Sequence, residues 1–362
     1  MSYSLTSQQL RQYIPTKDTR LTILVNAYST LVNPTPLDFP HDLVSQRDHS
    51  DVELMGHLHG FIGFIMQGGQ RQMTASLYAV MRHIERVHQH YSFSIQHDQL
   101  DSMSDWGWQS NSLFFLPDGT VRDPDGAVLV DPETGEPAEE ASIPFPGDAR
   151  ARKLASEARL SEMSIEVPDV LPPVIGEQEV ILRSAEDVAW RAIALFIVAV
   201  RAESLASGRP IPLEQLREKS KGVLEATSPL ETAFLKNDSP DQQSITNMAW
   251  RYECLYVLQW ALGFHDDLTL ANDICDVPLV AETMVQRGDR QILQMARLRP
   301  VSQILEAMDF NQRLLWAVRQ AKLNDQPLPA GLDGGVIVER QHTFNWLTRF
   351  EHADWDDVDT PS

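Results

Sequence analysis

The spacing of apolar residues over the first 148 positions alternates between two patterns. Leu21 to Ala27 is a short apolar run with β-branched residues, which predicts a strand. Over residues 51–67 and 74–91, apolar side chains recur every three or four positions, which predicts two amphipathic helices. The segment 117–119, Pro-Asp-Gly between two apolar runs, is typical of a hairpin turn. Residues 1–148 are therefore predicted to form a small mixed α+β domain.

From Arg183 onward the apolar spacing is helical almost without interruption. Ala192 to Val200 is apolar on every side of a helix, which predicts a central buried helix. Ser184 followed by Asp187 is a variant of the capping box that begins a helix. Residues 183–362 are therefore predicted to be a mainly α-helical domain, so the fold class is α+β overall. Further helices are predicted over residues 212–226, 229–236, 244–262, 277–286, 301–323 and 336–350.

A proline-rich stretch lies between these two regions. Seven prolines fall between residues 131 and 182, a density that prevents long helices. This composition predicts an extended connector over residues 149–182, with one short helix over 150–161. No internal repeat of solenoid length is present.

The charge of the chain narrows the classes of partner. The formal net charge is -21, which disfavours nucleic acid, because phosphate binding requires clustered Lys and Arg. It also disfavours anionic membrane surfaces. A basic protein partner suits such an acidic field. Solubility alone is the competing explanation of the same charge.

Composition indicates a soluble globular protein, since 43% of the residues are hydrophobic. Strongly apolar runs such as Ala194 to Val200 are far shorter than the roughly 20 residues that span a bilayer. No basic segment followed by an apolar stretch begins the sequence, so no signal peptide is predicted and the expected compartment is the cytoplasm. Cys254 and Cys275 are expected to be free thiols there.

The segment Trp250 to Glu253 sets charged side chains among large aromatic ones. On one continuous helix over residues 244–262, Trp250, Glu253 and Trp260 share a face, whereas Arg251 points roughly 200° away from Glu253. A carboxylate between tryptophans needs a cation from another helix or must stay protonated. We therefore predict separate partners for Glu253 and Arg251.

Other helices and the C-terminal tail supply more charged and aromatic residues at helical spacing, and two interpretations of them remain open. They could form buried bridges between helices, each losing about 3–5 kcal/mol when one partner is removed. They could instead line a pocket, with Glu253 or Glu339 as acid or base and arginines holding an anion. The candidate residues are Arg191, Trp250, Arg251, Glu253, Trp260, Asp309, Arg313, Trp316, Glu339, Arg340, Asn345, Trp346, Trp355, Asp356 and Asp357.

Metal and cofactor motifs are incomplete. His57 and His59 face opposite sides of a helix, and no carboxylate completes a ligand set with His83 and His90. The motifs of dinucleotide sites, phosphate loops and nucleophile elbows do not occur. We therefore predict no cofactor and no metal.

The C-terminal half resembles a bacterial family of unknown function, DUF4272, over residues 183–360. The N-terminal half is interpreted as the extension of a longer form. The chain departs from the family pattern over residues 341–344, and the family implies no catalytic residues. The resemblance rests on Arg183-Ser184, Arg191-Ala192, Ala194-Leu195, Ser228-Pro229 with Glu231, Trp250-Arg251-Tyr252-Glu253, Trp260-Ala261-Leu262-Gly263, Cys275-Asp276-Val277-Pro278, Leu298-Arg299, Trp316, Glu339-Arg340, Asn345-Trp346-Leu347 and Trp355-Asp356-Asp357.

These observations favour a cytoplasmic, non-enzymatic interaction protein, such as an immunity or accessory factor that binds a basic protein. The alternative is an enzyme or small-ligand binder with its pocket among Arg251, Glu253, Arg313, Glu339 and Arg340. A third possibility places the function in the N-terminal domain and makes the helical domain a scaffold. The oligomeric state stays open.

Overall fold

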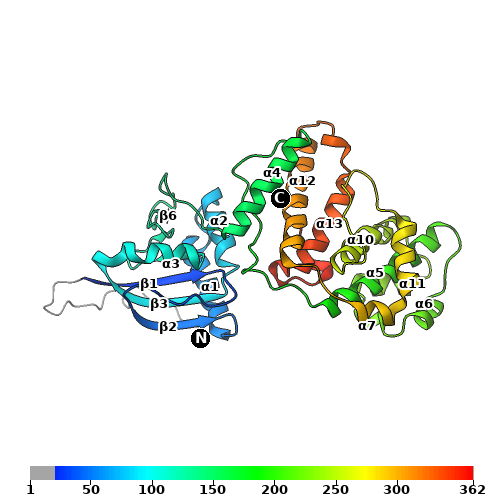
Figure 1. Ribbon diagram of the computed structural model, residues 1–362, viewed down its shortest axis with the longest axis horizontal. Helices are drawn as coiled ribbons and strands as arrows, with labels where there is room; N and C mark the ends of the chain where they lie inside the picture. Colours follow the sequence, from blue (N-terminus) through cyan, green and yellow to red (C-terminus); the bar gives the residue numbers. More distant parts are fainter. Residues whose placement is uncertain (1–20, 362) are drawn as a thin grey trace. The chain divides into compact units, whose positions relative to one another are not determined.

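The chain divides into two compact units, each with its own core. The computed structural model describes residues 21–361, and the boundary between the units falls after Gly147. The first unit is built around an antiparallel sheet and the second almost entirely from helices (Figure 1). The predicted α+β class is confirmed. No helix among residues 21–361 combines the length and the apolar character that a bilayer crossing requires.

The sheet of the first unit has six antiparallel strands in the order β2-β3-β1-β4-β5-β6. The predicted strand and the predicted hairpin are both present, as β1 and as β4 with β5. The strands are β1 (Thr22–Ser29), β2 (Asp42–Asp48), β3 (Gln89–Gln96), β4 (Ser112–Phe115), β5 (Val121–Arg122) and β6 (Val128–Val130).

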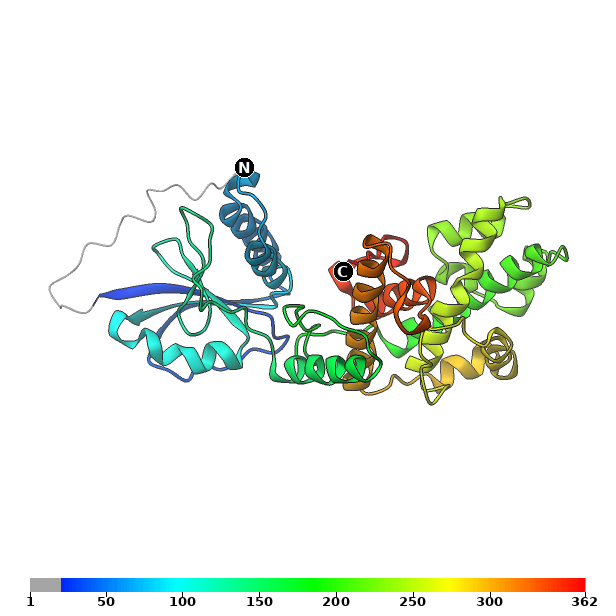
Figure 2. The ribbon, with the colours of Figure 1, turned by 90° about the horizontal axis from the view of Figure 1, so that it is seen from above.

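Helices cover both faces of this sheet (Figure 2). On one face, α1 (Val52–Ile65) and α2 (Ala75–Ile84) bury their apolar stripes against Tyr28 and its neighbours. On the other, Trp106 of α3 (Ser104–Gln109) packs among Phe93 and other strand aromatics. The short 3-10 segments of this unit are η2 (Gln67–Gly69) and η3 (His97–Met103).

The helix predicted over residues 74–91 ends early. It stops at Ile84, and residues 89–96 form strand β3 instead. All eight residues of β3 pair in register with β1, so Tyr91 lies opposite Ala27. The prediction was wrong at this end because strand pairing on both sides of β3 outweighs the local helical spacing.

In the second unit, α5 (Ala185–Ala206) is buried on nearly every side and begins with the predicted Ser184–Asp187 capping box. The predicted helices over 229–236 and 301–323 have the predicted bounds. The other elements are α4 (Gly147–Glu162), α6 (Leu213–Lys219), α7 (Val223–Ala226), α8 (Pro229–Lys236), α9 (Gln242–Ala249), α10 (Arg251–Ala261), α11 (Val277–Met295), α12 (Val301–Leu323), η4 (Pro329–Gly331), α13 (Gly334–Leu347), η5 (Phe350–His352) and η6 (Trp355–Asp357).

The helix predicted over residues 244–262 is divided at Trp250 into α9 and α10. Trp250 lies against Gly335, where an added Cβ would come within 2.9 Å of the indole ring. Trp250 therefore joins the core cluster around α12, whereas Trp260 joins the cluster around α5. The prediction that these two tryptophans share a helical face was wrong, because the helix is not continuous.

The proline-rich stretch contributes side chains and backbone groups to the helical unit. Arg313 of α12 donates to the carbonyl of Pro172 over 3.3 Å, and the amide of Val174 donates to Asp309 over 3.3 Å. Glu157 of α4 also pairs with Arg313, at 3.2 Å. These contacts hold Glu157 and residues 172–174 against α12.

Candidate functional site

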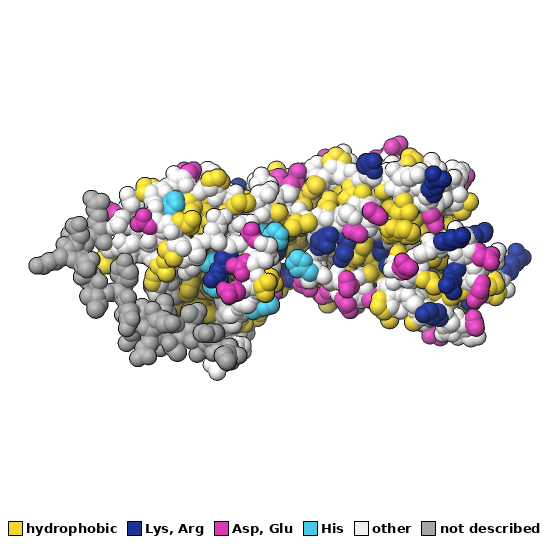
Figure 3. All heavy atoms as spheres, turned by 90° about the horizontal axis from the view of Figure 1, so that it is seen from below, with side chains coloured by type: hydrophobic (Ala, Val, Ile, Leu, Met, Phe, Trp, Pro, Cys, Tyr) yellow, Lys and Arg dark blue, Asp and Glu magenta, His cyan; other side chains and the backbone are white. Residues whose placement is uncertain are grey.

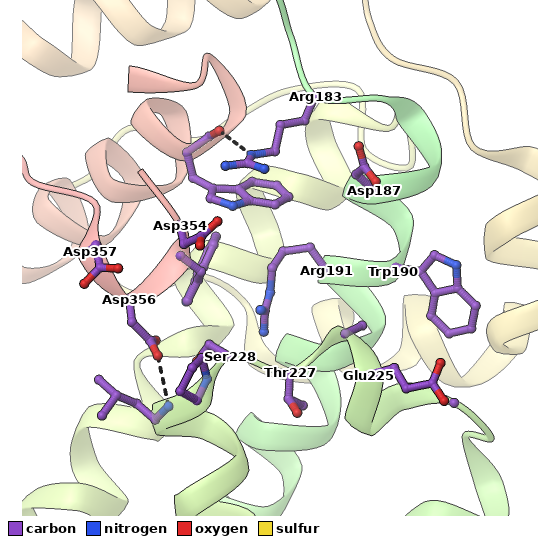
Figure 4. Close-up of a pocket in the computed structure, with 16 residues that line it drawn as sticks. Arg183, Asp187, Trp190, Arg191, Glu225, Thr227, Ser228, Asp354, Asp356 and Asp357 are labelled. Atoms are coloured by element: carbon purple, nitrogen blue, oxygen red, sulfur yellow. Dashed lines mark hydrogen bonds between the residues drawn. The ribbon is translucent and has the colours of Figure 1, made fainter. Parts of the chain in front are cut away.

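A cavity of about 960 Å³ opens in the helical unit where the start of α5 meets the α7–α8 corner and the C-terminal tail (Figure 4). Three tryptophans, two arginines and five carboxylates belong to its lining. The lining residues are Arg183, Asp187, Trp190, Arg191, Gly222, Glu225, Ala226, Thr227, Ser228, Pro229, Leu230, Trp346, Asp354, Trp355, Asp356 and Asp357.

Helix caps and one arginine shape this cavity. Ser228 begins α8 with a capping box completed by Glu231. Arg183 donates through Nε to the carbonyl of Trp346 and through Nη2 to that of Ala353, both over 2.9 Å. The tail is held on the opposite side as well, since Asp356 Oδ2 accepts the amide of Leu230 over 2.9 Å. The tail therefore forms one wall of the cavity.

Arg191 reaches from α5 into the cavity, where it is paired. Its Nη2 donates to Glu231 Oε2, and both side chains are buried. Its guanidinium carbon also lies 4.7 Å from the ring centroid of Trp355. Burial lowers the pKa of Arg191, while the charge of Glu231 opposes this shift. The pair resembles the bridges predicted from sequence, but it lies at the cavity wall.

Buried polar atoms without a hydrogen-bond partner gather around Trp355. Such atoms are uncommon, because each loses its hydration without compensation. Those of this cluster are Arg191 Nε, Glu231 Oε1, Arg251 Nε, His342 Nε2, Trp355 Nε1 and Asp356 Oδ1. Burial, followed by the charges of Arg251 and Arg191, lowers the pKa of His342 to about 4. Several hydrogen-bond donors and acceptors of this region therefore have no partner within residues 21–361.

The rim of the cavity is acidic. Asp187, Glu225, Asp354 and Asp357 are exposed, and none of them forms an ion pair within 4.0 Å among residues 21–361. Asp356 is half-buried, and its Oδ1 has no partner in the described part of the chain. Both arginines of the lining are already used in contacts with the chain itself. The cavity therefore has a surplus of negative charge.

Two further predicted residues lie directly behind this wall. Arg251 Nη1 is 3.0 Å from Glu339 Oε2, and its guanidinium carbon lies 5.8 Å from the Trp355 ring. Cys254 also contacts Glu339, with Sγ 3.0 Å from Oε2, and burial raises the pKa of this thiol. Arg251 and Glu339 thus support the wall without lining the cavity.

The pair Glu253 and Arg340 lies elsewhere in the core. Arg340 Nε is 3.4 Å from Glu253 Oε2, and both side chains are only 2% exposed. The other oxygen of Glu253 accepts the amide of Cys275, and Arg340 also donates to the carbonyl of Thr269. The two charges join α10 to α13 and to the loop before α11.

The remaining predicted residues occupy separate places. Asp309 pairs with Arg313 at 2.9 Å on α12, and Trp316 packs in the same core cluster as Trp250. Asn345 donates to the carbonyl of Asp359 over 2.7 Å and thereby fixes the tail. Trp260 lies under Arg299, whose guanidinium carbon is 5.0 Å from the ring.

The structure thus brings together only part of the predicted set. Arg191, Trp346, Trp355, Asp356 and Asp357 line one cavity. The capping sequences Ser184-x-x-Asp187 and Ser228-x-x-Glu231 mark the two helix starts at this cavity, but nothing local shows that these starts meet. The lining residues absent from the predicted set include Arg183, Asp187, Trp190, Glu225, Ser228 and Asp354.

The first unit contains a separate group of histidines. His57 Nε2 is 3.0 Å from the hydroxyl of Tyr28, and the His57 and His90 rings are 4.6 Å apart. Burial lowers the pKa of His90 to about 3, with His57 and Arg47 adding to the shift. Within residues 21–361, no three His, Cys, Asp or Glu side chains are placed to hold a metal ion.

Comparison with known families identifies the helical unit. The family described as a domain of unknown function (DUF4272) matches residues 152–358. The match begins within α4, so it includes residues 152–182 of the proline-rich stretch as well as the helices that surround the cavity. No curated protein and no solved structure matches the chain.

Proposed function

The chain belongs to the DUF4272 family, and on that premise we propose that it is a non-enzymatic binding protein whose acidic cavity receives a basic segment of a partner protein. The negative charge of the cavity rim supports this proposal most directly. Five carboxylates line the cavity, whereas its two arginines are engaged by the chain itself. A positively charged segment would supply the missing counter-charge.

The distribution of charge favours the cavity, rather than the rest of the surface, as the place where a basic partner binds. Acidic and basic side chains are interspersed over the face of the helical unit seen in Figure 3. The net charge of -21 is therefore not gathered into one acidic patch on that face. The cavity rim concentrates carboxylates beside aromatic rings, an arrangement that attracts cations both by charge and through the ring faces.

An enzymatic role is less well supported. The two carboxylates predicted as acid or base, Glu253 and Glu339, are paired with Arg340 and Arg251. Neither belongs to the lining of the cavity. Binding of a small molecule is the second candidate, because a cavity of about 960 Å³ is within the range of ligand pockets.

A cytoplasmic location and an accessory or immunity role complete the proposal. An acidic rim would accelerate the encounter with a basic protein. An inhibitor of a basic toxin or a helper of a basic enzyme would both use such a cavity.

Calorimetric titration with short basic peptides tests the proposal. A peptide of alternating glycine and arginine should bind at low salt and weaken as salt rises, whereas its glutamate counterpart should not bind. The double variant Asp354→Asn/Asp357→Asn removes two rim charges and should weaken binding. The control Glu214→Gln/Glu218→Gln removes two exposed charges from α6 and should not.

Two results would reject the proposal. Equal weakening by both double variants would show that only the net charge of the protein matters. No binding of the basic peptide by the unmodified protein at low salt would remove the basis for a basic partner.

A further inference from the structure

Arginines already lie over two of the three tryptophans that line the cavity. The guanidinium carbon of Arg183 is 4.5 Å from the ring centroid of Trp346, and that of Arg191 is 4.7 Å from Trp355. Trp190 is half-buried, and within residues 21–361 no cation lies over its ring. The chain thus uses the same contact twice and leaves the third ring available.

Two carboxylates flank Trp190. Asp187 precedes it by three positions on α5, so both side chains are on the same side of that helix. Glu225 comes from α7, and Figure 4 shows Asp187 and Glu225 on either side of the indole. Asp187 Oδ2 accepts the amide of Ser184 over 3.3 Å, and Glu225 forms no ion pair among the described residues. Negative charge therefore borders the available ring.

We propose, on the basis of the function proposed above, that Trp190, Asp187 and Glu225 form a subsite for an arginine side chain of the partner's basic segment. A guanidinium is flat, weakly hydrated and able to donate to two carboxylates while it stacks on an indole. A lysine ammonium is a compact, strongly hydrated charge that cannot stack in this way. The subsite therefore prefers arginine.

Buried donors at the same cavity suit a polypeptide as the occupant. Arg191 and Trp355 are 5% and 4% exposed, both line the cavity, and Arg191 Nε and Trp355 Nε1 have no acceptor among residues 21–361. What these donors lack is an oxygen. A backbone carbonyl next to the arginine would supply one, whereas a free polyamine or a metal ion would not. An arginine within a peptide would therefore place its guanidinium on Trp190 and offer a backbone carbonyl to the donors of Arg191 and Trp355.

The test compares two capped peptides of alternating sequence, glycine with arginine and glycine with lysine, by calorimetric titration of the full chain. The arginine peptide should bind at least about threefold more tightly than the lysine peptide, from the stacking contact. Trp190→Ala should weaken the arginine peptide by about 3- to 30-fold and remove the preference over lysine. Trp190→Phe, which keeps a ring face, should restore part of the preference.

A second variant, which changes only a charge, distinguishes loss of binding from loss of the fold. Glu225→Gln changes an exposed side chain, so the fold should persist, and it should weaken the arginine peptide more than the matched control Glu218→Gln. Melting curves identify any variant that has lost its fold.

The outcomes separate the subsite from the broader function. If Trp190→Ala and Glu225→Gln bind the arginine peptide as the unmodified protein does, while Asp354→Asn/Asp357→Asn weakens it, the subsite is wrong and the acidic cavity stands. Equal binding of both peptides by the unmodified protein overturns the preference for a guanidinium. If neither peptide binds at low salt, the proposed function fails, and the subsite fails with it.

Discussion

The two units treat their buried polar groups in opposite ways. Buried histidines such as His83 and His90 lie within the sheet unit, and their pKa values are lowered to about 3 with burial as the main cause. The helical unit buries Arg191, Arg313 and Arg340, each of which meets a carboxylate. The sheet unit therefore buries imidazoles that stay neutral, whereas the helical unit buries guanidiniums that stay charged and paired, together with the neutral imidazole of His342.

This difference follows from the side chains themselves. An imidazole can lose its proton when burial penalises the charge, whereas a guanidinium keeps it and must find a counter-charge. The helical unit should therefore be most sensitive to the loss of one partner. The sheet unit should lose more stability than the helical unit through protonation of buried histidines, because His83 and His90 lie in it and only His342 has a comparably lowered pKa in the helical unit. Each sensitivity can be measured separately by hydrogen exchange on peptides from residues 21–147 and 183–361.

The largest effect is expected at the pair that joins α10 to α13. Glu253→Ala leaves Arg340 buried with its charge unmatched and frees the amide of Cys275, so the helical unit should lose about 3–5 kcal/mol of unfolding free energy. Denaturant titration measures the loss, and hydrogen exchange should assign it to the helical unit alone.

Glu218→Ala is the control, because this carboxylate on α6 is exposed. Its effect should stay within about 0.5 kcal/mol. A similar small loss for Glu253→Ala would mean that the buried pair contributes little. The contrast between the two cores would then fail.

Local signals predicted much of the fold. Proline at the first helical position and a capping box fix the start of α8, so its bounds could be predicted to the residue. The failures lie where distant segments decide. Strand β3 exists because β1 and β2 pair with it, and the break at Trp250 coincides with the close packing against Gly335.

The candidate site was harder to predict for the same reason. The sequence identified Arg191 on the central helix and Trp355 in the C-terminal tail as candidate residues. It could not identify Trp190 or Glu225 as their neighbours, because the cavity forms only where α5, α7 and the tail meet. Spacing predicted separate partners for Glu253 and Arg251 but could not name them: Arg251 meets Glu339, and Glu253 meets Arg340. Partner choice in a helical bundle depends on packing angles that one helix does not encode.

The second largest effect is expected from acid, which should lower the stability that His83 and His90 contribute to the sheet unit. Each buried histidine has a folded pKa below its ordinary value of 6.5, so the unfolded chain binds its proton more readily. The stability that His83 and His90 contribute is therefore complete above pH 6.5 and declines as pH falls towards 3. The steepest loss is about 1.4 kcal/mol per pH unit for each histidine.

His90→Asn tests this slope, since asparagine keeps a donor for Asn26 and cannot be protonated. Unfolding of the sheet unit should then take up about one proton fewer at acidic pH, so its free energy of unfolding should depend less steeply on pH. The pH dependence of the unfolding free energy of the helical unit should not change. His97→Asn, the same change at an exposed position, is the control. An unchanged slope in His90→Asn would show that His90 is not held neutral by the fold.

The smallest effect compares how completely helices are packed in the two units. Gly60 lies on the exposed side of α1, where an added Cβ meets nothing within 4 Å, whereas a Cβ on Gly335 of α13 would press on Trp250 at 2.9 Å. Gly60→Ala should stabilise the sheet unit by about 0.5–1 kcal/mol, because alanine loses less backbone entropy in a helix. Gly335→Ala should destabilise the helical unit by about 1–3 kcal/mol through overpacking. Thermal melts should show a higher melting temperature for Gly60→Ala and a lower one for Gly335→Ala. A loss of stability in Gly60→Ala would show that the outer face of α1 is packed in solution.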